Sequence, residues 1–400
     1  MTKSNMKKVL VFTSTFPSFA EGDATPPFVY ELSQRLAQKW LHISVLTPRV
    51  PWSKKYEIKD NIKIYRYPYF FRSSWEQLNN WAILPNIKKN KWLVFQIPFL
   101  LIAWFFALIK VTKKENIEII HAHWLIPQWL LVCIYKKIWN KKIKILCTAH
   151  GSDIHSLWWK FMKRLQKFVL NTSDYITVVS HYLEDEARKL GVTKPIDVIS
   201  MGVDTDKFNP NTYDENIKIK NSILDKFLLY VGRLAPEKGI TYLLWAMPGI
   251  IKRYPQIKLM IIGAWPLEAQ LKHQADMLHL QESLIRKGRI DHKDIVPYFA
   301  TADIFILPSL KESFGLVLVE AMLSGSIVVA SRLNGIWDII QDKDNGFLVQ
   351  PGESYDMENT LQYCLENMKI LQSRKEESII AIAKKFGWET ISEKYFTLLK

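Results

Sequence analysis

The stretch ADIFILPSLKESFGLVLVEAMLSGSIVVAS, residues 302–331, holds two apolar runs that are separated by a polar loop and a helical segment. The runs, at 302–308 and 326–331, are rich in Ile and Val. They lack the alternation of apolar and polar residues that marks a strand with one solvent-exposed face. Gly315 permits a tight turn from the loop into the helix, because glycine has no Cβ to restrict its backbone. A strand, a helix and a second strand in this order indicate a parallel sheet covered by helices.

The same alternation of apolar runs and amphipathic stretches extends through the chain. A helix with a prolyl start is predicted at 26–40. Further strand-like runs lie at 8–14, 42–48, 62–68, 117–123, 143–150, 174–180, 195–200, 226–233 and 257–263. The expected fold class is therefore α/β, with two doubly wound parallel-sheet domains of Rossmann type.

The polar stretch at 209–221 interrupts this pattern near the middle of the chain. We expect one domain at 1–205 and a second at 206–385, because 400 residues exceed one ordinary domain. Parallel sheets bind ligands at the carboxyl ends of their strands, so a cleft between the two domains is the expected active site. The amphipathic helix at 386–400 is expected to pack at the domain junction, and capping of the second domain is the alternative.

Positive charge is concentrated in the first half of the chain. The whole chain has 54 Lys and Arg against 39 Asp and Glu, and residues 1–200 hold 30 against 14, a net charge of +16. Such asymmetry predicts contact with an anionic surface, either lipid or nucleic acid, unless the lysines serve solubility alone. A nucleic-acid partner is disfavoured, because the sequence contains no zinc finger or recognisable RNA-binding motif.

Cysteine use and the first residues predict a cytoplasmic protein. Cys133, Cys147 and Cys364 are odd in number and lack metal-ligand spacing, which fits a reducing compartment. The basic start leads into an apolar run of only a strand's length, without a small-residue cleavage site. Together with the basic first half, this predicts a peripheral location on the inner face of the cell membrane.

The run WLVFQIPFLLIAWFFALI, residues 92–109, is interrupted only by Gln96 and Pro98. Three interpretations are open: a buried or half-buried helix that starts afresh at Pro98, a patch that rests on a membrane, and a membrane-spanning helix. Lysines flank the run, at Lys88, Lys89, Lys91, Lys110, Lys113 and Lys114. The aromatic and basic stretch at 157–170 favours a membrane patch, and a core face with a solvated basic face explains that stretch equally well.

Two glutamates in the opening stretch are candidate ligand-binding residues. Glu312 is expected in the loop, and Glu320 on the inner face of the helix that follows Gly315. The backbone N–H groups at a helix N-terminus bind phosphate, and a carboxylate one or two turns further in can hold ribose hydroxyls. A surface loop and an ordinary amphipathic helix are the plainer alternative.

The segment YVGRLAPEKGI, residues 230–240, places Arg233 and Lys238 directly after a buried strand. Two cations at the carboxyl end of a strand suit a leaving diphosphate, whose negative charge grows as a glycosidic bond breaks. A solvated loop is the alternative, and the position right after the strand favours the functional interpretation.

Together these motifs resemble the retaining glycosyltransferases of family 4, which have the GT-B fold. The resemblance rests on VGRLAPEKG, PSLKESFG, ESFGLVLVEA, TAHGSD and SMGVD, and it extends to TPPFVYELSQRLA, HAHWLIPQW and FGWETI. It implies that the first domain lies on the acceptor side and that the second domain binds a nucleotide-sugar donor.

The resemblance also implies roles for individual residues. Glu312 would meet hydroxyls of the transferred sugar, and Glu320 would bind the donor ribose. Arg233 and Lys238 match the diphosphate-binding pair, and His150 matches the active-site histidine of the first domain. The other implied donor contacts are the loop amides of Phe314, Gly315, Leu316 and Val317 and the base-binding positions Arg289 and Ile290.

The chain departs from the family pattern in three loops. The loop at 17–27 has Gly22 alone where many relatives carry paired glycines, so Gly22 is the candidate phosphate contact there. GAWP at 263–266 replaces the usual Gly-Asp-Gly-like turn. Trp129 stands where similar sequences often have a small residue, and we expect it to narrow the acceptor side.

Neither of two metal-like motifs predicts a metal site. Asp204-Thr205-Asp206 has the form of a metal-binding Asp-x-Asp, but its place at the end of the first domain favours a turn and helix cap. His121 and His123 lie at a strand end without an evident third ligand, so acceptor-side or structural roles are favoured over zinc. We expect no metal and no cofactor.

The expected function is that of a retaining, hexosyltransferase-type enzyme of cell-surface polysaccharide or glycolipid biosynthesis. Its partners would be a UDP- or GDP-sugar and a saccharide or lipid-linked acceptor. A sugar-nucleotide epimerase on the same fold and a basic nucleic-acid-binding protein are the alternatives. A nicotinamide dehydrogenase is disfavoured, because neither first strand is followed by G-x-G-x-x-G.

Overall fold

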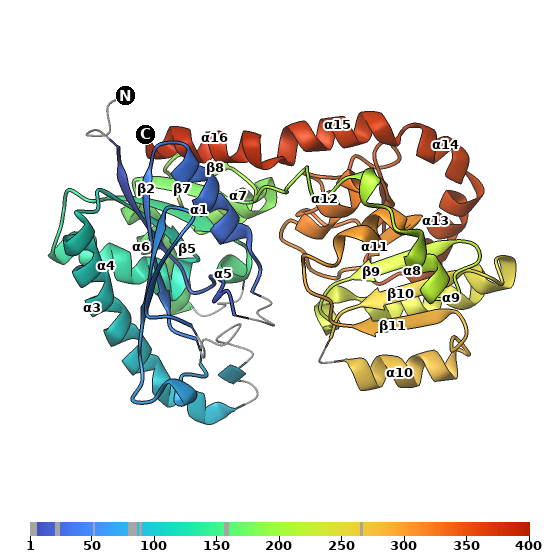
Figure 1. Ribbon diagram of the computed structural model, residues 1–400, viewed down its shortest axis with the longest axis horizontal. Helices are drawn as coiled ribbons and strands as arrows, with labels where there is room; N and C mark the ends of the chain where they lie inside the picture. The colour runs from blue at the N-terminus through green and yellow to red at the C-terminus, as the bar shows by residue number, and fades with distance from the viewer. Residues whose placement is uncertain are drawn as a thin grey trace. The chain divides into compact units, whose positions relative to one another are not determined.

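The computed structural model describes residues 6–20, 25–50, 53–78, 86–87, 90–155, 160–264 and 267–400. The chain forms two compact units, Met1–Gly202 with Ile391–Lys400 and Val203–Thr390 (Figure 1). Each unit is built on a largely parallel sheet that is covered by helices. The predicted α/β class with two Rossmann-like domains is confirmed.

The first unit has an eight-stranded sheet in the order β3-β4-β2-β1-β5-β6-β7-β8. Its strands are β1 (Lys8–Phe12), β2 (His42–Pro48), β3 (Tyr56–Lys59), β4 (Ile62–Tyr67), β5 (Ile119–His123), β6 (Lys144–Ala149), β7 (Tyr175–Val178) and β8 (Asp197–Val198). Neighbouring strands pair in parallel except β3 and β4, which form an antiparallel hairpin at the edge. The prediction omits β3, because this edge strand is exposed and lacks an apolar run.

Helices cover the sheet of the first unit. They are α1 (Phe28–Gln38), α3 (Ile97–Glu115), α4 (Leu130–Ile138), α5 (Ser152–His155), α6 (Lys160–Thr172), α7 (His181–Lys189) and the greater part of α16 (Trp388–Leu399). Helix α1 begins directly after Pro27 and buries Val29, Leu32 and Leu36, as its spacing predicts.

Helix α3 is a half-buried helix of the first unit. A 3-10 segment at Lys91–Gln96 precedes it, and α3 starts at Ile97 with Pro98 in its first turn. The buried stripe includes Leu100, Trp104 and Leu108, so the predicted half-buried helix with a start at Pro98 is confirmed, and its opposite side is left exposed. By length and composition alone, Lys91–Glu115 could cross a membrane.

The second unit has a six-stranded, all-parallel sheet in the order β11-β10-β9-β12-β13-β14. Its strands are β9 (Phe227–Val231), β10 (Lys258–Ile262), β11 (Leu284–Gly288), β12 (Ile304–Leu307), β13 (Ile327–Ser331) and β14 (Phe347–Val349). Its helices are α8 (Glu215–Lys220), α9 (Ile240–Arg253), α10 (Glu268–Met277), α11 (Val296–Thr301), α12 (Leu316–Leu323), α13 (Ser354–Glu366), α14 (Met368–Ser373) and α15 (Lys375–Phe386). The two edge strands, β11 and β14, are missing from the prediction because one is polar and the other has only three residues.

The chain passes between the two units at Val203 and again within α16. Val203 forms a parallel bridge with Gly387, so the two passages are joined by backbone contacts. Residues Ile391–Lys400 belong to the first unit, where Tyr395 and Leu399 are buried. The structural boundaries are thus Gly202–Val203 and Thr390–Ile391, a few residues from the predicted ones.

Candidate functional site

The strand order of the second unit brings two loops to one point of the sheet. The chain runs outward from β9 to β10 and β11, and then crosses to β12 on the other side of β9. The loops after β9 and β12, at 232–239 and 308–315, therefore adjoin at the carboxyl edge of the sheet. Open parallel sheets bind ligands at such a reversal of strand order. Both candidate motifs of this unit fall in these two loops.

Backbone contacts hold the two loops together. Gly239 ends the first loop with a φ of +65°, and a Cβ added to it would lie 2.0 Å from the carbonyl oxygen of Pro308. The N–H of Leu310 donates to the carbonyl oxygen of Glu237 at 2.8 Å. The close approach of the loops thus depends on a residue without a side chain at 239.

We expect Gly239→Ala to lower the free energy of unfolding by about 3 kcal/mol, because strain at positive φ is added to the clash with Pro308. Gly288 is a matched control, since its φ is +64° and a Cβ there would meet no atom within 4 Å. Gly288→Ala should therefore cost only about 1 kcal/mol. Urea unfolding measures both values, and equal losses would contradict a role for the close approach.

An ion pair joins the two candidate motifs. The Nζ of Lys238 donates to Oε2 of Glu312 at 2.7 Å, and the Ser309 hydroxyl lies 3.4 Å from the same oxygen. The two charged side chains are only 19% and 15% exposed, so water screens their attraction less than at an open surface. The structure thus brings Lys238 and Glu312 together in a partly buried position.

Arg233 occupies a different position from Lys238, although both lie in the same loop. Its guanidinium group donates to Oε1 of Glu237 at 2.8 Å, and its side chain is 66% exposed. Its charge is therefore at the surface of the loop, paired with a neighbour along the chain.

Helix α12 begins at the second loop, as predicted. Gly315 is the N-cap with a φ of +88°, and no side chain caps the helix there. The first N–H groups of a helix have no partner within the helix, so those that follow Gly315 can donate to a ligand. Phe314 is buried and packs against Phe386, with ring centroids 5.5 Å apart, which anchors the loop just before the helix.

Glu320 lies further along α12 and has a partner that the sequence does not reveal. Its side chain is 9% exposed, and its Oε1 lies 2.9 Å from Nε2 of His292. His292 follows β11 and its ring packs beside Phe208. The structure places the predicted base-binding pair, Arg289 and Ile290, at the carboxyl end of β11. The only sequence signal for His292 is its position two residues after this pair.

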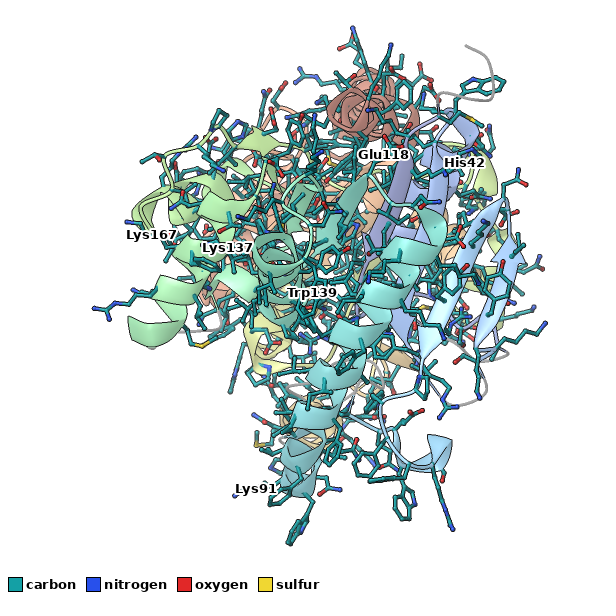
Figure 2. All side chains as sticks on the ribbon, turned by 90° about the vertical axis from the view of Figure 1, so that its left-hand side faces the viewer. His42, Lys91, Glu118, Lys137, Trp139 and Lys167 are labelled. Atoms are coloured by element: carbon teal, nitrogen blue, oxygen red, sulfur yellow. The ribbon has the colours of Figure 1, made fainter. Side chains whose placement is uncertain are left out.

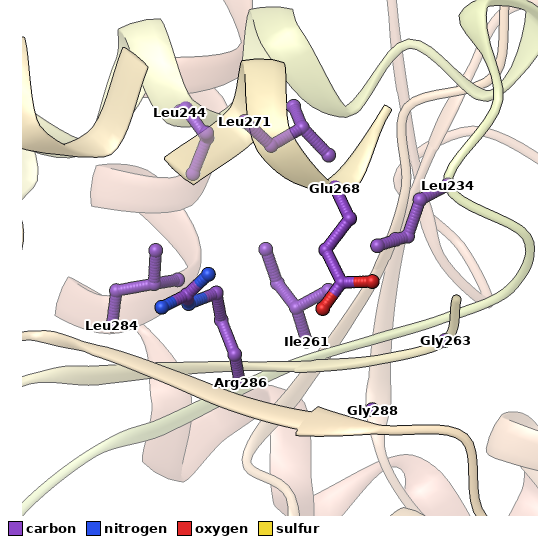
Figure 3. A pocket seen from close by; sticks show the side chains of 9 residues that line it. All are labelled: Leu234, Leu244, Ile261, Gly263, Glu268, Leu271, Leu284, Arg286 and Gly288. Atoms are coloured by element: carbon purple, nitrogen blue, oxygen red, sulfur yellow. The ribbon is translucent and has the colours of Figure 1, made fainter. Parts of the chain in front are cut away.

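A small cavity lies between the strands β10 and β11 and the helices α9 and α10 that cover them (Figure 3). Its volume of about 20 Å³ has room for roughly one water molecule, so it is no sugar or nucleotide pocket in this form. Its lining residues are Leu234, Leu244, Ile261, Gly263, Glu268, Leu271, Leu284, Arg286 and Gly288. The carboxylate of Glu268 and the guanidinium group of Arg286 reach it from α10 and β11, respectively.

In the first unit, His150 belongs to a stack of aromatic rings at the ends of β5 and β6. Its Nε2 lies 3.0 Å from Nδ1 of His123, and the two imidazole planes are inclined by only 18°. The rings of Trp124 and Phe28 lie against His150 with centroids 4.7 and 5.3 Å away. The Asp153 carboxylate accepts the N–H groups of His150 at 3.2 Å and of Gly151 at 2.8 Å, which fixes the loop that carries the histidine.

A buried chain of polar groups continues from His121 toward α16. Nε2 of His121 lies 2.8 Å from the Thr148 hydroxyl, which in turn lies 2.7 Å from the Thr177 hydroxyl. The Tyr395 hydroxyl lies 3.4 Å from that of Thr148. Tyr395 thus joins the last helix to the central strands of the first unit.

Burial keeps the three histidines neutral. Loss of solvation lowers the pKa of His121 and of His150 to about 3, and the mutual repulsion of protonated rings adds to the shift at His121. The same two causes hold the pKa of His123 well below its ordinary value. Burial raises the pKa of the Asp153 carboxyl, and its backbone hydrogen bonds oppose that shift.

Several loop predictions can be compared with the structure. Trp129 is fully buried and its indole N–H donates to the Ser173 hydroxyl, so the prediction that it narrows an acceptor site is wrong. Asp204 accepts the N–H groups of Asp206 and Lys207, as predicted for a turn. Gly22 and residues 265–266 lie outside the described residues. Within the described ranges, no three His, Cys, Asp or Glu side chains are grouped to hold a metal ion.

Two family models match the chain, one for each unit. The model of Glycosyltransferase Family 4 matches residues 27–207, and that of Glycosyl transferases group 1 matches residues 214–386. N-acetyl-alpha-D-glucosaminyl L-malate synthase of Bacillus anthracis is 26% identical over 380 residues, which cover 92% of this chain and 91% of the relative. Phosphatidyl-myo-inositol mannosyltransferase of Mycobacterium leprae is 33% identical over 171 residues, which cover 42% of this chain and 45% of the relative.

Solved structures match the chain over nearly its whole length. Sucrose-phosphate synthase of Thermosynechococcus elongatus has a TM-score of 0.80 at 20% identity, over 98% of both chains. Anabaena HepE, solved in complex with UDP-glucose, has a TM-score of 0.74 at 17% identity, over 98% of this chain and 99% of that one. At these identities the likeness shows the fold alone. With the two family matches and the shared architecture, the chain belongs to the group 1 glycosyltransferases of family 4, enzymes with the GT-B fold.

Proposed function

We propose that this glycosyltransferase binds a UDP- or GDP-sugar on its second unit and transfers a hexose-type sugar, with retention, to a saccharide or lipid-linked acceptor. The observation that carries the proposal is the Lys238–Glu312 ion pair beside the N-terminus of α12, at the reversal of strand order. One cation, one carboxylate and free helix N–H groups at a single point suit a ligand that combines a diphosphate with sugar hydroxyls.

In this proposal the diphosphate lies against Lys238 and the N-terminus of α12. The Lys238 ammonium group and the amides of the 314–317 loop stabilise the negative charge that develops on the leaving diphosphate. Arg233 is close in sequence and well exposed, so it can leave Glu237 and bind the outer phosphate oxygens. We assign no metal and no cofactor to this step.

Carboxylates hold the hydroxyl groups of the donor. The Glu320 carboxylate would accept hydrogen bonds from the ribose hydroxyls. His292 would fix the orientation of this carboxylate through the 2.9 Å contact. Glu312 would accept hydroxyls of the transferred sugar, and Arg289 and Ile290 would contact the base. From the first unit we propose His150 as a contact of the transferred sugar, as the family resemblance implies.

The reaction itself requires one bond to break and one to form at the anomeric carbon. The bond from this carbon to the diphosphate oxygen breaks, and the acceptor oxygen bonds to the same face of the carbon. The acceptor proton passes to a phosphate oxygen of the donor, and a nucleoside diphosphate leaves. The residues of the chain position the sugar and stabilise charge, without an enzymic nucleophile.

The named relatives support this assignment of substrates. HepE is solved with UDP-glucose, a donor of the proposed class. The names of two curated relatives contain a glucosaminyl and a mannosyl group, and one of them names a phosphatidyl-inositol. These names favour a sugar donor and make a lipid-linked acceptor a reasonable choice.

Thermal unfolding against UDP-, GDP- and ADP-sugars tests the donor site. A donor at a hundredfold excess over its Kd should stabilise the protein by about 2.7 kcal/mol, a shift of several degrees in Tm. We expect one nucleotide class to give this shift and Glu320→Ala to abolish it. Glu377→Ala, a change on the exposed surface of α15, is the control and should retain the shift.

The proposal fails if no nucleotide sugar shifts the Tm of the wild type. A shift that Glu320→Ala retains in full would place the donor elsewhere in the chain. Conversion of the bound donor into its epimer without any acceptor would support the epimerase instead.

A further inference from the structure

We propose that the outer surface of α3 docks the first unit on an anionic lipid bilayer, in the plane of the headgroups. This surface, the α3 face, consists of Trp92, Phe95, Phe99, Ile102 and Phe106. These side chains are between 45% and 76% exposed. Their spacing of three and four residues places them along one side of the helix and the 3-10 segment before it.

Aromatic side chains from neighbouring segments enlarge the α3 face. Phe71 is 80% exposed, and its ring centroid lies 6.0 Å from that of Phe99. Trp139, at the end of α4, is 50% exposed and lies 5.4 Å from Phe105. Figure 2 looks onto this side of the unit, with Lys91 at the lower end of the 3-10 segment that precedes α3 and Trp139 beside the helix. A continuous exposed patch of this kind marks a binding surface in a soluble protein.

The opposite side of α3 is fastened to the sheet. Trp104 and Leu108 are fully buried, and the Trp104 ring lies 5.0 Å from the ring of Phe12 in the central strand β1. A membrane-spanning α3 would have to expose this buried side and give up its packing. The geometry therefore points to a helix that lies on the membrane with one face, as monotopic helices do.

The charges around the α3 face fit an anionic lipid surface. No Asp or Glu occurs between Glu76 and Glu115, whereas six lysines lie in that interval. Lys110 and Lys113 continue the exposed side beyond Phe106, and Lys91 lies at the other end. At about 1.5 Å per residue the apolar stripe is roughly 20 Å long, with cations at both ends to meet headgroup phosphates.

A second copy of the chain fits the α3 face poorly. An antiparallel pair of α3 helices would set Lys91 of each copy against the Lys110 and Lys113 end of the other. A parallel pair would set identical lysines together. Either arrangement brings like charges into an apolar contact, and the segment has no carboxylate to compensate them.

Flotation of the full chain with vesicles tests the proposal, independently of any donor, because binding needs no turnover. We expect the wild type to float with vesicles of roughly equal parts phosphatidylglycerol and phosphatidylcholine, and far less with phosphatidylcholine alone. The triple variant Trp92→Ser, Phe95→Ser, Phe106→Ser should lower the partition coefficient by on the order of 100-fold. The matched control is the triple variant Trp40→Ser, Trp245→Ser, Tyr355→Ser, which replaces aromatic side chains of similar exposure elsewhere and should bind as the wild type does.

The variant Lys91→Gln, Lys110→Gln, Lys113→Gln separates the electrostatic part of the binding. It should reduce binding to the anionic vesicles by on the order of 100-fold. An unchanged Tm for each variant shows that it has folded. Equal flotation of the wild type and the aromatic variant would overturn the proposal. A wild-type dimer that the aromatic variant abolishes, together with no vesicle binding, would assign the face to a second copy and overturn it as well.

Discussion

Replacement of Lys238 by alanine is expected to lower kcat by roughly 100- to 1000-fold, because the negative charge that develops on the proposed diphosphate loses a partly buried cation. The same change leaves the Glu312 carboxylate, which is only 15% exposed, without its ion-pair partner. The sugar hydroxyl that Glu312 is proposed to hold would then be positioned less well. Steady-state kinetics with the donor identified by thermal stabilisation measure the effect.

Lys311→Ala is the matched control for this experiment. Lys311 precedes Glu312 in the same loop, and its side chain is exposed to solvent. Its removal changes the net charge of the site as much as Lys238→Ala does, so a kcat within about threefold of the wild type is expected. A Lys238→Ala variant that also stayed within this range would contradict the proposed position of the diphosphate.

The effect of Lys238 is expected to be coupled to that of Glu312. When two residues act as one unit, the double variant loses less activity than the product of the single losses. The variant Lys238→Ala, Glu312→Ala should therefore be close to the worse of the two single variants in kcat. Multiplied losses would mean that the 2.7 Å contact has no part in the reaction.

Acid is expected to destabilise the first unit well before its carboxylates are protonated. An unfolded histidine takes up a proton as the pH falls below about 6.5, whereas His121 and His150 stay neutral in the fold down to about pH 3. Below pH 6.5 the unfolded state therefore binds protons that the folded state does not bind. As a result, the free energy of unfolding is unaffected by these histidines above pH 6.5 and decreases as the pH falls toward 3. At pH 5 each of these two histidines costs about 2 kcal/mol.

Two other groups modify this loss. His123, whose pKa is also lowered, changes stability in the same direction. The Asp153 carboxyl has a raised pKa, so the folded state retains its proton at a higher pH than the unfolded state does, and it partly offsets the histidines in acid. The net effect is a loss of stability on acidification, because three histidines oppose one carboxyl.

Hydrogen–deuterium exchange of peptides from β5 and β6 reports this effect for the first unit alone. The protection factor is the exchange rate of an unstructured amide at the same pH divided by the measured rate. The protection factors at pH 5 should be lower than those at pH 7.5 by on the order of 100-fold or more. His121→Asn should remove part of this pH dependence, whereas His273→Asn, at an exposed position of the second unit, should leave it unchanged. Equal protection at the two pH values would show that the imidazoles are hydrated or already protonated in the fold.

The sequence by itself determined which segments become strands and helices. Apolar runs such as 42–48 and 304–307 pair as buried parallel strands, and Pro27 and Pro98 mark the starts of α1 and α3. These features are local, because burial on both faces requires an unbroken apolar run and proline restricts the backbone at its own position. The edge strands β3, β11 and β14 were not predicted. A strand at the edge of a sheet can be short or polar, so it does not require an unbroken apolar run.

Only the tertiary structure decided which distant side chains meet. The sequence separates Lys238 from Glu312 by 74 positions and His292 from Glu320 by 28, and each pair lies within about 3 Å in the fold. The first pair meets because β9 and β12 adjoin, whereas β11 is no neighbour of β12, and the segment after β11 carries His292 to α12. The stack of His123 on His150 and the exposure of the α3 face arise in the same way. Periodicity shows that a residue is apolar or lies at a strand end, but its neighbour depends on which strands adjoin in the sheet. Strand order is a property of the whole chain, because it is set by packing between segments far apart in the sequence.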